Sequence, residues 1–346
     1  MELTYQTRRK LKRGGIIALA ALLVLVLVWG CWLVWVERHI VYSRDGAVLD
    51  FALTSRDPGE GQLALPPAET EPVSIYYNDG SELGTAELAM RQITGYSITA
   101  DMLQNDMDTI RATIASLPVG TAVMMEVKSG RGTFYYTTGV EGAYTAKAMD
   151  LEAVDQLIAD MASRNLYLIA SVPAFRDRNF AVEHISSGLP FIGGDGALWV
   201  DSGGCYWLDP TDSAFRDYLT KITRELKSLG FDEVLFTEFC FPDTAELYYS
   251  GDRVMAIQEA AAILVENCAT DRFAVSFLAT GSTVKPVAGR SRLYLTGVSA
   301  TGAETTAAGY SVEDPAVNLV FMTDSYDTRY EICSVIRPME MAAVNE

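Results

Sequence analysis

The sequence predicts an α/β protein, a (β/α)8 barrel of the TIM type that follows one N-terminal transmembrane helix. From residue 93 onward, short apolar segments alternate with segments whose apolar residues recur at helical spacing, as in the β-α units of a parallel barrel. Hydrophobic residues make up 49% of the 346 residues, which is enough to fill a large core. The competing fold, an open doubly wound sheet, normally has a glycine-rich phosphate loop after its first strand. Residues 100–103 read Ala-Asp-Met-Leu instead.

The N-terminal segment has the features of a membrane anchor. Residues 16–36 contain no charged side chain and are long enough to cross a bilayer as a helix. Residues 1–15 hold a basic cluster, which by the positive-inside rule places them in the cytoplasm and the rest of the chain outside the cell. A cleaved signal peptide would have a shorter apolar core and a small-residue cleavage site. An uncleaved, single-pass signal anchor in the cell membrane is therefore favoured.

Residues 37–92 are expected to form an extracellular stalk. The prolines Pro66, Pro67 and Pro72 stand among acidic residues, and the composition of the segment is mixed. Residues 73–83 have the pattern of a short strand followed by a turn. We therefore expect a few short ordered elements here and no second catalytic domain.

The expected barrel occupies residues 93–340, and its elements can be placed in order. Strands are expected at residues 95–100, 121–129, 166–175, 234–236, 273–279, 292–298 and 317–325. Helices are expected at residues 101–116, 151–161, 211–229 and 253–267, where apolar side chains fall on one helical face. Helices between residues 280 and 316 are poorly signalled, so the last third of the barrel is expected to be incomplete or irregular.

Charge and residue counts exclude several classes of function. The net charge of the chain is −18, which argues against a nucleic acid as its partner. With two histidines and no Cys-x-x-Cys pair, the chain lacks the residues for a multi-histidine metal site or a Ser-His-Asp triad. We expect no metal and no cofactor. The four cysteines beyond the anchor are expected to be scattered buried thiols, with a disulfide left open as the alternative.

Residues 206–242 are the most informative part of the sequence. A helical stretch that ends at Gly230 is followed by an apolar strand, which becomes polar at Thr237 and Glu238 and cannot continue through Pro242. In parallel barrels the C-terminal ends of the strands carry the active site. Because a carboxylate in such a position needs a partner, solvent or a function, Glu238 is a candidate site residue.

This segment resembles the bacterial putative glycosyl hydrolase domain family, a domain of unknown function related to alpha-amylase-like TIM barrels. The resemblance rests on a Trp-x-Asp-Pro turn, an Arg-x-Tyr helix and a Gly-Phe-Asp-Glu strand start within residues 206–242. Segments upstream match the family more weakly, at residues 124–136, 166–184 and 198–210. The resemblance extends over residues 93–335 and implies a glycoside hydrolase that acts on the O-glycosyl bonds of a polysaccharide.

The chain departs from the family's active-site motif at the end of the central strand. Where the family has Phe-Asp-Tyr-Ile-Arg-Phe-Pro, residues 236–242 read Phe-Thr-Glu-Phe-Cys-Phe-Pro. By analogy with amylase-type barrels, Thr237 replaces the nucleophilic aspartate, and Cys240 replaces an arginine. Glu238 lies one position further along, and side chains on a strand alternate in direction. Residues 273–290, where amylase-type enzymes carry the acid, contain no acidic side chain.

The sequence thus yields two sets of candidate site residues. The catalytic candidates, of which hydrolysis requires a pair, are Glu238, Asp177 and Asp324. The substrate-binding candidates are Glu126, Lys128, Phe175, Arg176, Trp199, Trp207, Thr237 and Phe239. The structural alternatives are a pair of Glu126 with Lys128, a pair of Asp177 with Arg176 or Arg178, a helix cap by Asp324, and core packing of the phenylalanines.

Three functions remain open. The first is a membrane-anchored extracellular glycoside hydrolase that acts on a polysaccharide of the cell surface or the environment. The second is a pseudoenzyme that binds the carbohydrate without cleaving it, and the third is a structural protein of the cell envelope. The substitutions at residues 237 and 240 favour the second function over the first.

Overall fold

The computed structural model describes residues 25, 28–30, 32, 40–43, 46–49, 89–194, 196–280 and 284–339. The chain divides into two compact units, residues 1–77 and 78–346. Most of the expected membrane helix and the expected strand and turn of the stalk lie outside the described residues. Within the described part of the chain, no helix combines the length and the apolar character that a membrane crossing requires.

The described residues of the first unit include one antiparallel pair of strands. These are β1 (Ile40–Ser43) and β2 (Gly46–Leu49), with Ser43 opposite Gly46. The pair lies in the region that the sequence assigns to the stalk, where short strands were expected.

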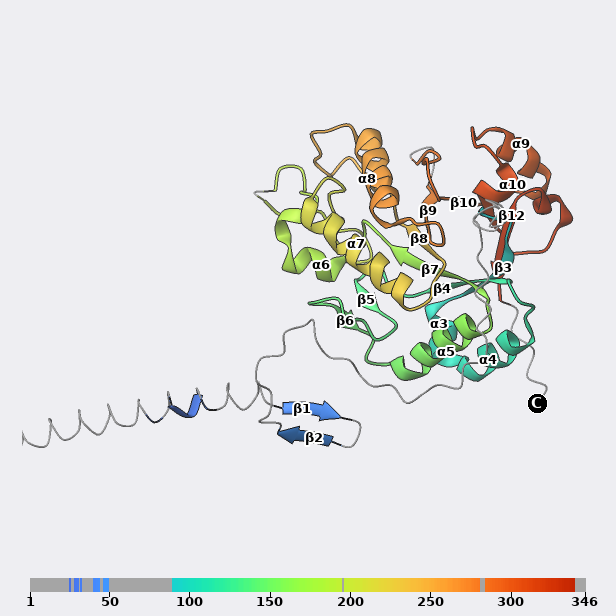
Figure 1. Cartoon of the computed structure of the whole chain (residues 1–346). Coiled ribbons are helices and arrows are strands. Elements are labelled where there is room, and N and C mark those ends of the chain that lie inside the picture. Colours follow the sequence, from blue (N-terminus) through green and yellow to red (C-terminus); the bar gives the residue numbers. More distant parts are fainter. Residues whose placement is uncertain are drawn as a thin grey trace, which may run out of the picture. The chain divides into compact units, whose positions relative to one another are not determined.

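The second unit is built on a closed barrel of eight parallel strands (Figure 1). In chain order they are β3 (Thr94–Ile98), β4 (Ala122–Glu126), β7 (Tyr167–Pro173), β8 (Glu233–Thr237), β9 (Ala274–Ala279), β10 (Leu293–Thr296), β11 (Leu319–Met322) and β12 (Ser334–Pro338). Each strand pairs with the next, and β12 pairs with β3 to close the barrel. The predicted α/β barrel is confirmed. Of the two alternatives for its last third, incomplete or irregular, the first is wrong because β12 closes the barrel.

The longest helices on the outside of the barrel lie in its middle part, and those in its last part are short. They are α3 (Ala100–Asn105), α4 (Met107–Ser116), α5 (Leu151–Ser163), α6 (Arg178–Glu183), α7 (Ser213–Ser228), α8 (Arg253–Cys268), α9 (Ala303–Ala308) and α10 (Pro315–Asn318). The expected helix at 101–116 is two helices, because the backbone leaves the helical region at Asp106 (φ −131°). The helices α7 and α8 pack side by side (Figure 1). The irregularity expected between residues 280 and 316 is present as α9 and α10.

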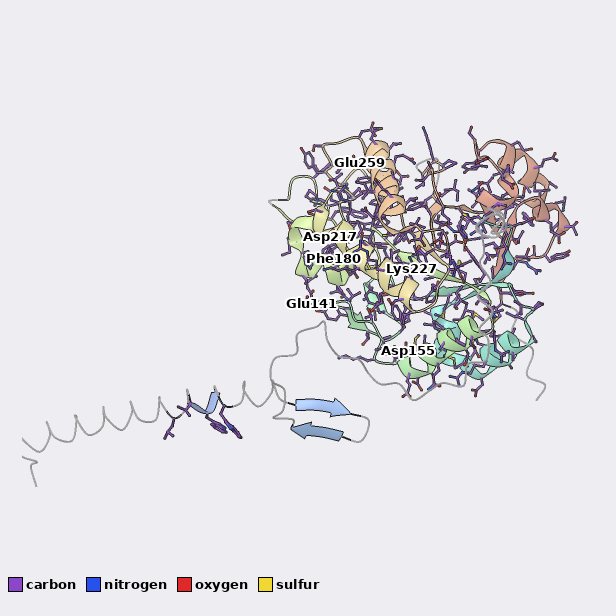
Figure 2. All side chains as sticks on the ribbon, in the orientation of Figure 1. Glu141, Asp155, Phe180, Asp217, Lys227 and Glu259 are labelled. Atoms are coloured by element: carbon purple, nitrogen blue, oxygen red, sulfur yellow. The ribbon has the colours of Figure 1, made fainter. Side chains whose placement is uncertain are left out.

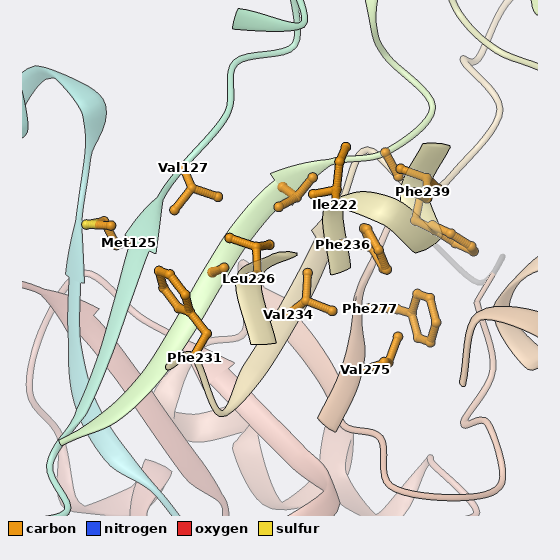
Figure 3. Packing of buried hydrophobic residues seen from close by; sticks show 14 of the residues in the cluster. Met125, Val127, Ile222, Leu226, Phe231, Val234, Phe236, Phe239, Val275 and Phe277 are labelled. Atoms are coloured by element: carbon orange, nitrogen blue, oxygen red, sulfur yellow. The ribbon is translucent and has the colours of Figure 1, made fainter. Parts of the chain in front are cut away.

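Two hydrophobic clusters stabilise this unit. Alternate residues of the strands, among them Met124, Leu235 and Ile336, form the cluster inside the barrel. The intervening residues pack outward against the helices, as Val234 and Phe236 do in Figure 3. This alternation follows from the two-residue period of a strand, and it fixes which side chains can reach the barrel interior.

A buried polar network fills the N-terminal end of the barrel. The Glu233 carboxylate forms an ion pair with Arg292 and accepts hydrogen bonds from the hydroxyls of Tyr294 (2.9 Å) and Tyr167 (2.8 Å). Burial, followed by the charge of Glu233, raises the pKa of Tyr294 well above its ordinary value, so this tyrosine stays neutral. In barrels of this type the N-terminal end serves stability and the opposite end serves function.

Candidate active site at the barrel mouth

The alternation of side chains places Glu126 and Thr237 at the mouth of the barrel. Met124 and Leu235 lie inside the barrel, so the residues two positions later on the same strands also face inward. Glu126 Oε2 accepts a hydrogen bond from the backbone N–H of Ala100 at 2.7 Å. This contact, at the first residue of α3, differs from the pairing with Lys128 that the sequence left open. Both Glu126 and Thr237 are half-buried.

Glu238 follows β8 directly and has an unusual backbone. It is half-buried and its φ is +50°, a left-handed conformation that non-glycine residues rarely adopt. Such strain is most common at ligand-binding and catalytic sites. The hydrogen bond to Asp201 raises the pKa of Arg176, with partial burial opposing it and the nearby charge of Glu238 adding to it. Glu238 therefore lies at the mouth near a guanidinium group.

Asp177 is buried in a polar cluster that supports a structural role. Its Oδ2 lies 2.7 Å from Lys128 Nζ, and neither side chain has exposed surface. The same oxygen accepts a hydrogen bond from the Tyr218 hydroxyl at 3.0 Å, while Oδ1 accepts one from the backbone N–H of Phe180 at 2.8 Å and caps α6. The partner of Asp177 is thus Lys128. The alternative left open by the sequence, a pair with Arg176 or Arg178, is wrong. A carboxylate without exposed surface is not placed to touch a substrate.

Asp324 lies in the loop after β11 and is exposed. The last short helix, η3 (Thr328–Ile332), is capped by Asp327, whose side chain accepts a hydrogen bond from the Arg329 N–H. The structural alternative for Asp324, a cap of this helix, is therefore wrong. Its catalytic role stays a prediction.

The aromatic candidates divide into core residues and mouth residues. Phe175 and Phe239 are buried, with ring centroids 4.4 Å apart, which matches their core-packing alternative. Trp207 is 6% exposed. Trp199 is half-buried, and its indole N–H donates a hydrogen bond to Glu246 Oε2 at 3.1 Å. Among these four residues, Trp199 offers the most accessible ring.

Asp201, which the sequence did not single out, organises the loop at one side of the mouth. Its carboxylate accepts hydrogen bonds from Arg176 Nε (2.5 Å), the Trp207 indole N–H (3.1 Å) and the backbone N–H groups of Gly203 (2.9 Å) and Cys205 (3.0 Å). Partial burial acts to raise the pKa of Asp201, but these hydrogen bonds and the Arg176 charge lower it to about 2. The available signal was the Asp-Ser-Gly-Gly turn, in which an aspartate side chain commonly bonds to the following backbone.

Replacing Asp201 by asparagine is expected to lower the melting temperature at pH 7 by roughly 3–6 °C, because several hydrogen bonds to a charged group are weakened. A carboxylate whose pKa is lowered by folding stabilises the folded state above its unfolded pKa of about 4 and loses that effect as the pH falls toward about 2. The difference from wild type should therefore shrink between pH 5 and pH 3 in thermal melts. The exposed Asp271→Asn is the matched control, and a pH-independent difference would contradict this account.

The largest cavity that we describe lies between α6, the first turns of α7 and the segment that follows β4. It has a volume of about 480 Å³ and is lined by residues of α6, of α7 and of the segment between β4 and α5. Glu141, Phe180 and Asp217, which Figure 2 labels in this region, are among them. None of the candidate site residues lines this cavity.

The described residues contain no group of three or more histidine, cysteine or acidic side chains that could hold a metal ion. Cys205, Cys240, Cys268 and Cys333 are free and buried, in agreement with the expectation of scattered thiols. The chemistry available at the mouth is thus that of half-buried carboxylates, an arginine, a threonine hydroxyl and aromatic rings.

Residues 93–269 match the model of a family described as "Putative glycosyl hydrolase domain". The chain belongs to this family. The match begins with β3 and ends after α8, so it covers the first half of the barrel, in which Glu126, Thr237 and Glu238 lie. The family named from residues 206–242 is thereby confirmed. No curated protein matches the chain.

Solved structures that resemble this chain include glycosidases. A GH36 alpha-galactosidase from Geobacillus stearothermophilus is 12% identical with a TM-score of 0.51, and the match covers 75% of this chain and 40% of that one. A hypothetical protein from Ruminiclostridium thermocellum is 19% identical with a TM-score of 0.45 over 53% of this chain and 96% of that one. A GH20 exo-beta-N-acetylglucosaminidase from Vibrio harveyi is 10% identical with a TM-score of 0.46, and the match covers 68% of this chain and 42% of that one. The chain spans less than half the length of these two glycosidases, and the likeness concerns the fold alone.

Proposed function

We propose that this member of the family binds a carbohydrate chain in the mouth of its barrel without cleaving it. The observation that carries the proposal is Thr237, which faces into the barrel at the end of β8, where the family motif has an aspartate. A threonine hydroxyl does not ionise near neutral pH, so it cannot replace a carboxylate as nucleophile or base.

The positions of the other carboxylates support the same conclusion. Glycoside hydrolysis uses two carboxyl groups on opposite sides of the scissile bond. Asp177 is fully buried and paired with Lys128, and Asp324 is exposed in the loop after β11. Of the three catalytic candidates, only Glu238 is half-buried at the barrel mouth, because Asp177 is buried and Asp324 is exposed.

The groups that remain accessible at the mouth suit the recognition of sugars. Trp199 and Tyr206 are half-buried and offer ring faces and edges to the C–H groups of a sugar. Glu126, Arg176 and Thr237 are also half-buried and can exchange hydrogen bonds with hydroxyl groups. A few polar groups among aromatic side chains are typical of a binding site for small molecules.

Hydrolysis by Glu238 together with Glu126 is the second candidate function. The observation that favours it is the left-handed backbone of Glu238, because strain of this kind is concentrated at functional sites. In this alternative, one of the two half-buried carboxyl groups protonates the leaving oxygen and the other attacks or activates water.

We also propose that the protein acts at the outer face of the cell membrane. The support comes from the sequence, in which the uncharged run of residues 16–36 follows a basic cluster. Labelling of intact cells with a membrane-impermeant reagent that reacts with a tag after residue 346 tests this placement. Labelling only after the cells are permeabilised would contradict it.

The binding function predicts a specific effect of Trp199. The full-length chain in detergent micelles should bind at least one polysaccharide of a broad panel in affinity electrophoresis. Trp199→Ala should weaken that binding by roughly tenfold, because stacking on one aromatic ring contributes about 1.4 kcal/mol. Tyr144→Ala, at an exposed tyrosine that lines the cavity of about 480 Å³, is the matched control.

The same samples separate the two candidate functions. Release of reducing ends by the wild type, abolished by both Glu238→Gln and Glu126→Gln, would establish hydrolysis and contradict our proposal. Binding that survives in Glu238→Gln without release of reducing ends in any sample is the result we expect. A chain that binds no polysaccharide of the panel would count against both functions.

A further inference from the structure

Two guanidinium groups meet at one glycine on the rim of the barrel mouth. Arg131 Nη2 donates a hydrogen bond to the carbonyl oxygen of Gly203 at 3.2 Å. A β-carbon on Gly203 would clash with Arg176 Nη2, so the head group of Arg176 rests against the same residue. The arginines come from different loops. The backbone N–H of Asn179 in α6, the helix that begins two residues after Arg176, donates a hydrogen bond to the Arg131 carbonyl oxygen (3.1 Å).

The guanidinium group of Arg176 is held in one orientation, and only some of its N–H groups donate hydrogen bonds. Its Nε–H donates to Asp201 at 2.5 Å, and its side chain is 25% exposed. A β-carbon on Gly130 would lie 2.6 Å from Nη1, so glycines flank the guanidinium on two sides. Within the described part of the chain, the side-chain hydrogen bond of Arg176 uses Nε, and neither Nη1 nor Nη2 donates a hydrogen bond. The outer edge of the guanidinium therefore keeps donors that can bind an oxyanion in a bidentate way.

The local charge is opposite in sign to that of the whole chain. Arg131, Arg176 and Arg178 all lie near the Cys205 thiol, where their charges oppose the rise in its pKa that burial causes. The neighbouring anions that act on Arg176 are Asp201 and Glu238. Three guanidinium groups and two carboxylates thus lie in this part of a protein whose net charge is −18. A local positive site on an acidic protein attracts anions that the rest of the surface repels.

We propose that Arg131 and Arg176 form a subsite for the carboxylate group of an acidic sugar at the barrel mouth. The proposal rests on the function proposed above and deepens it, because it gives the bound carbohydrate a negative charge. The planar fork of Arg176 matches the two oxygens of a carboxylate. Arg131, which lies at the same glycine, adds a second positive charge that attracts the carboxylate. A sulfate group on a sugar presents similar oxygens, and the test below separates the two.

The test measures binding of three tetrasaccharides to the full-length chain in detergent micelles by calorimetry. The ligands are a tetragalacturonate, its methyl ester, which carries no charge, and a sulfated neutral tetrasaccharide. We expect the tetragalacturonate to bind at least about tenfold more tightly than its ester, as a charge-assisted bidentate contact requires. Arg176→Gln should remove this preference, and Arg131→Gln should reduce it.

Gly203→Ala separates a positioned site from general attraction between charges. The added β-carbon displaces the Arg176 head group while every charge is kept, so the preference for the acid should fall by about the same factor as in Arg176→Gln. Arg272→Gln, at an exposed arginine that precedes β9, changes the net charge equally and should leave the preference unchanged.

The outcomes have different meanings. Equal affinity for the acid and its ester, or an Arg176→Gln variant that retains the preference, overturns the subsite. A loss in Arg272→Gln as large as in Arg176→Gln also overturns it, since net charge alone would then explain binding. Tight binding of only the sulfated ligand, with the same dependence on Arg176 and Gly203, overturns the carboxylate and reassigns the subsite to sulfate. Binding of neutral polysaccharides through Trp199 without any preference for acids would leave the proposed function standing and remove this inference alone.

Discussion

Replacing Arg292 by methionine is expected to lower the free energy of unfolding by about 3–5 kcal/mol. The change leaves Glu233 at the first position of β8, with 0% exposure, without the cation that compensates its charge. The hydroxyls of Tyr167 and Tyr294 already donate to this carboxylate, so they cannot compensate further. Urea unfolding of the full-length chain, followed by circular dichroism, measures the effect.

The control for this prediction is an ion pair on the surface. Arg329 pairs with Asp327 at 2.5 Å, but its side chain is 55% exposed, so Arg329→Met should cost less than about 1 kcal/mol. The double variant Glu233→Gln with Arg292→Met should regain part of the lost stability, because neither charge then remains buried. If Arg292→Met and Arg329→Met lowered the free energy of unfolding equally, the polar network at the N-terminal end of the barrel would contribute little to stability.

Asp177→Asn is expected to lower the free energy of unfolding by a similar amount, about 3–5 kcal/mol. The substitution keeps the shape of the side chain but leaves the buried Lys128 ammonium without its partner at 2.7 Å. Below its melting temperature the variant should still bind carbohydrate, since Asp177 has no exposed surface. Chemical unfolding and affinity electrophoresis on the same preparation measure both properties.

A double variant again isolates the buried charge. Lys128→Met combined with Asp177→Asn should be more stable than Asp177→Asn alone, because no unpaired cation remains. Asp271→Asn, which removes an exposed carboxylate, is the matched control. A variant Asp177→Asn with wild-type stability but without carbohydrate binding would show that Asp177 acts at the site, and our structural interpretation would be wrong.

The sequence was sufficient for the first seven strands and insufficient for the eighth. Strands such as β7 and β8 are continuous apolar runs between clear helices, a pattern that local hydrophobicity reveals. The segment of β12 reads Ser-Val-Ile-Arg-Pro and follows the short helix η3, so neither its polarity nor its neighbour indicates a barrel strand. Closure of the barrel between β12 and β3 joins residues about 240 positions apart, which no local pattern contains.

In the candidate site, too, the sequence did not reveal contacts between side chains that are far apart in the chain. The sequence placed Asp177 and Glu126 correctly near strand ends, but their partners are distant in the chain. Lys128 reaches Asp177 across 49 positions, and the hydroxyl of Tyr218 comes from α7. The charge of Asp201 and its effect on Arg176 also depend on a loop conformation that the sequence did not define.

The most direct test of a mouth that binds carbohydrate without cleaving it is a mass measurement on captured ligand. The full-length chain is incubated with oligosaccharides of defined length from a polysaccharide that it binds, and the captured chains are analysed by mass spectrometry. We predict that they are recovered at unchanged length, because Thr237 supplies no second carboxyl group. Shortened chains, absent from the Glu238→Gln sample, would contradict the account.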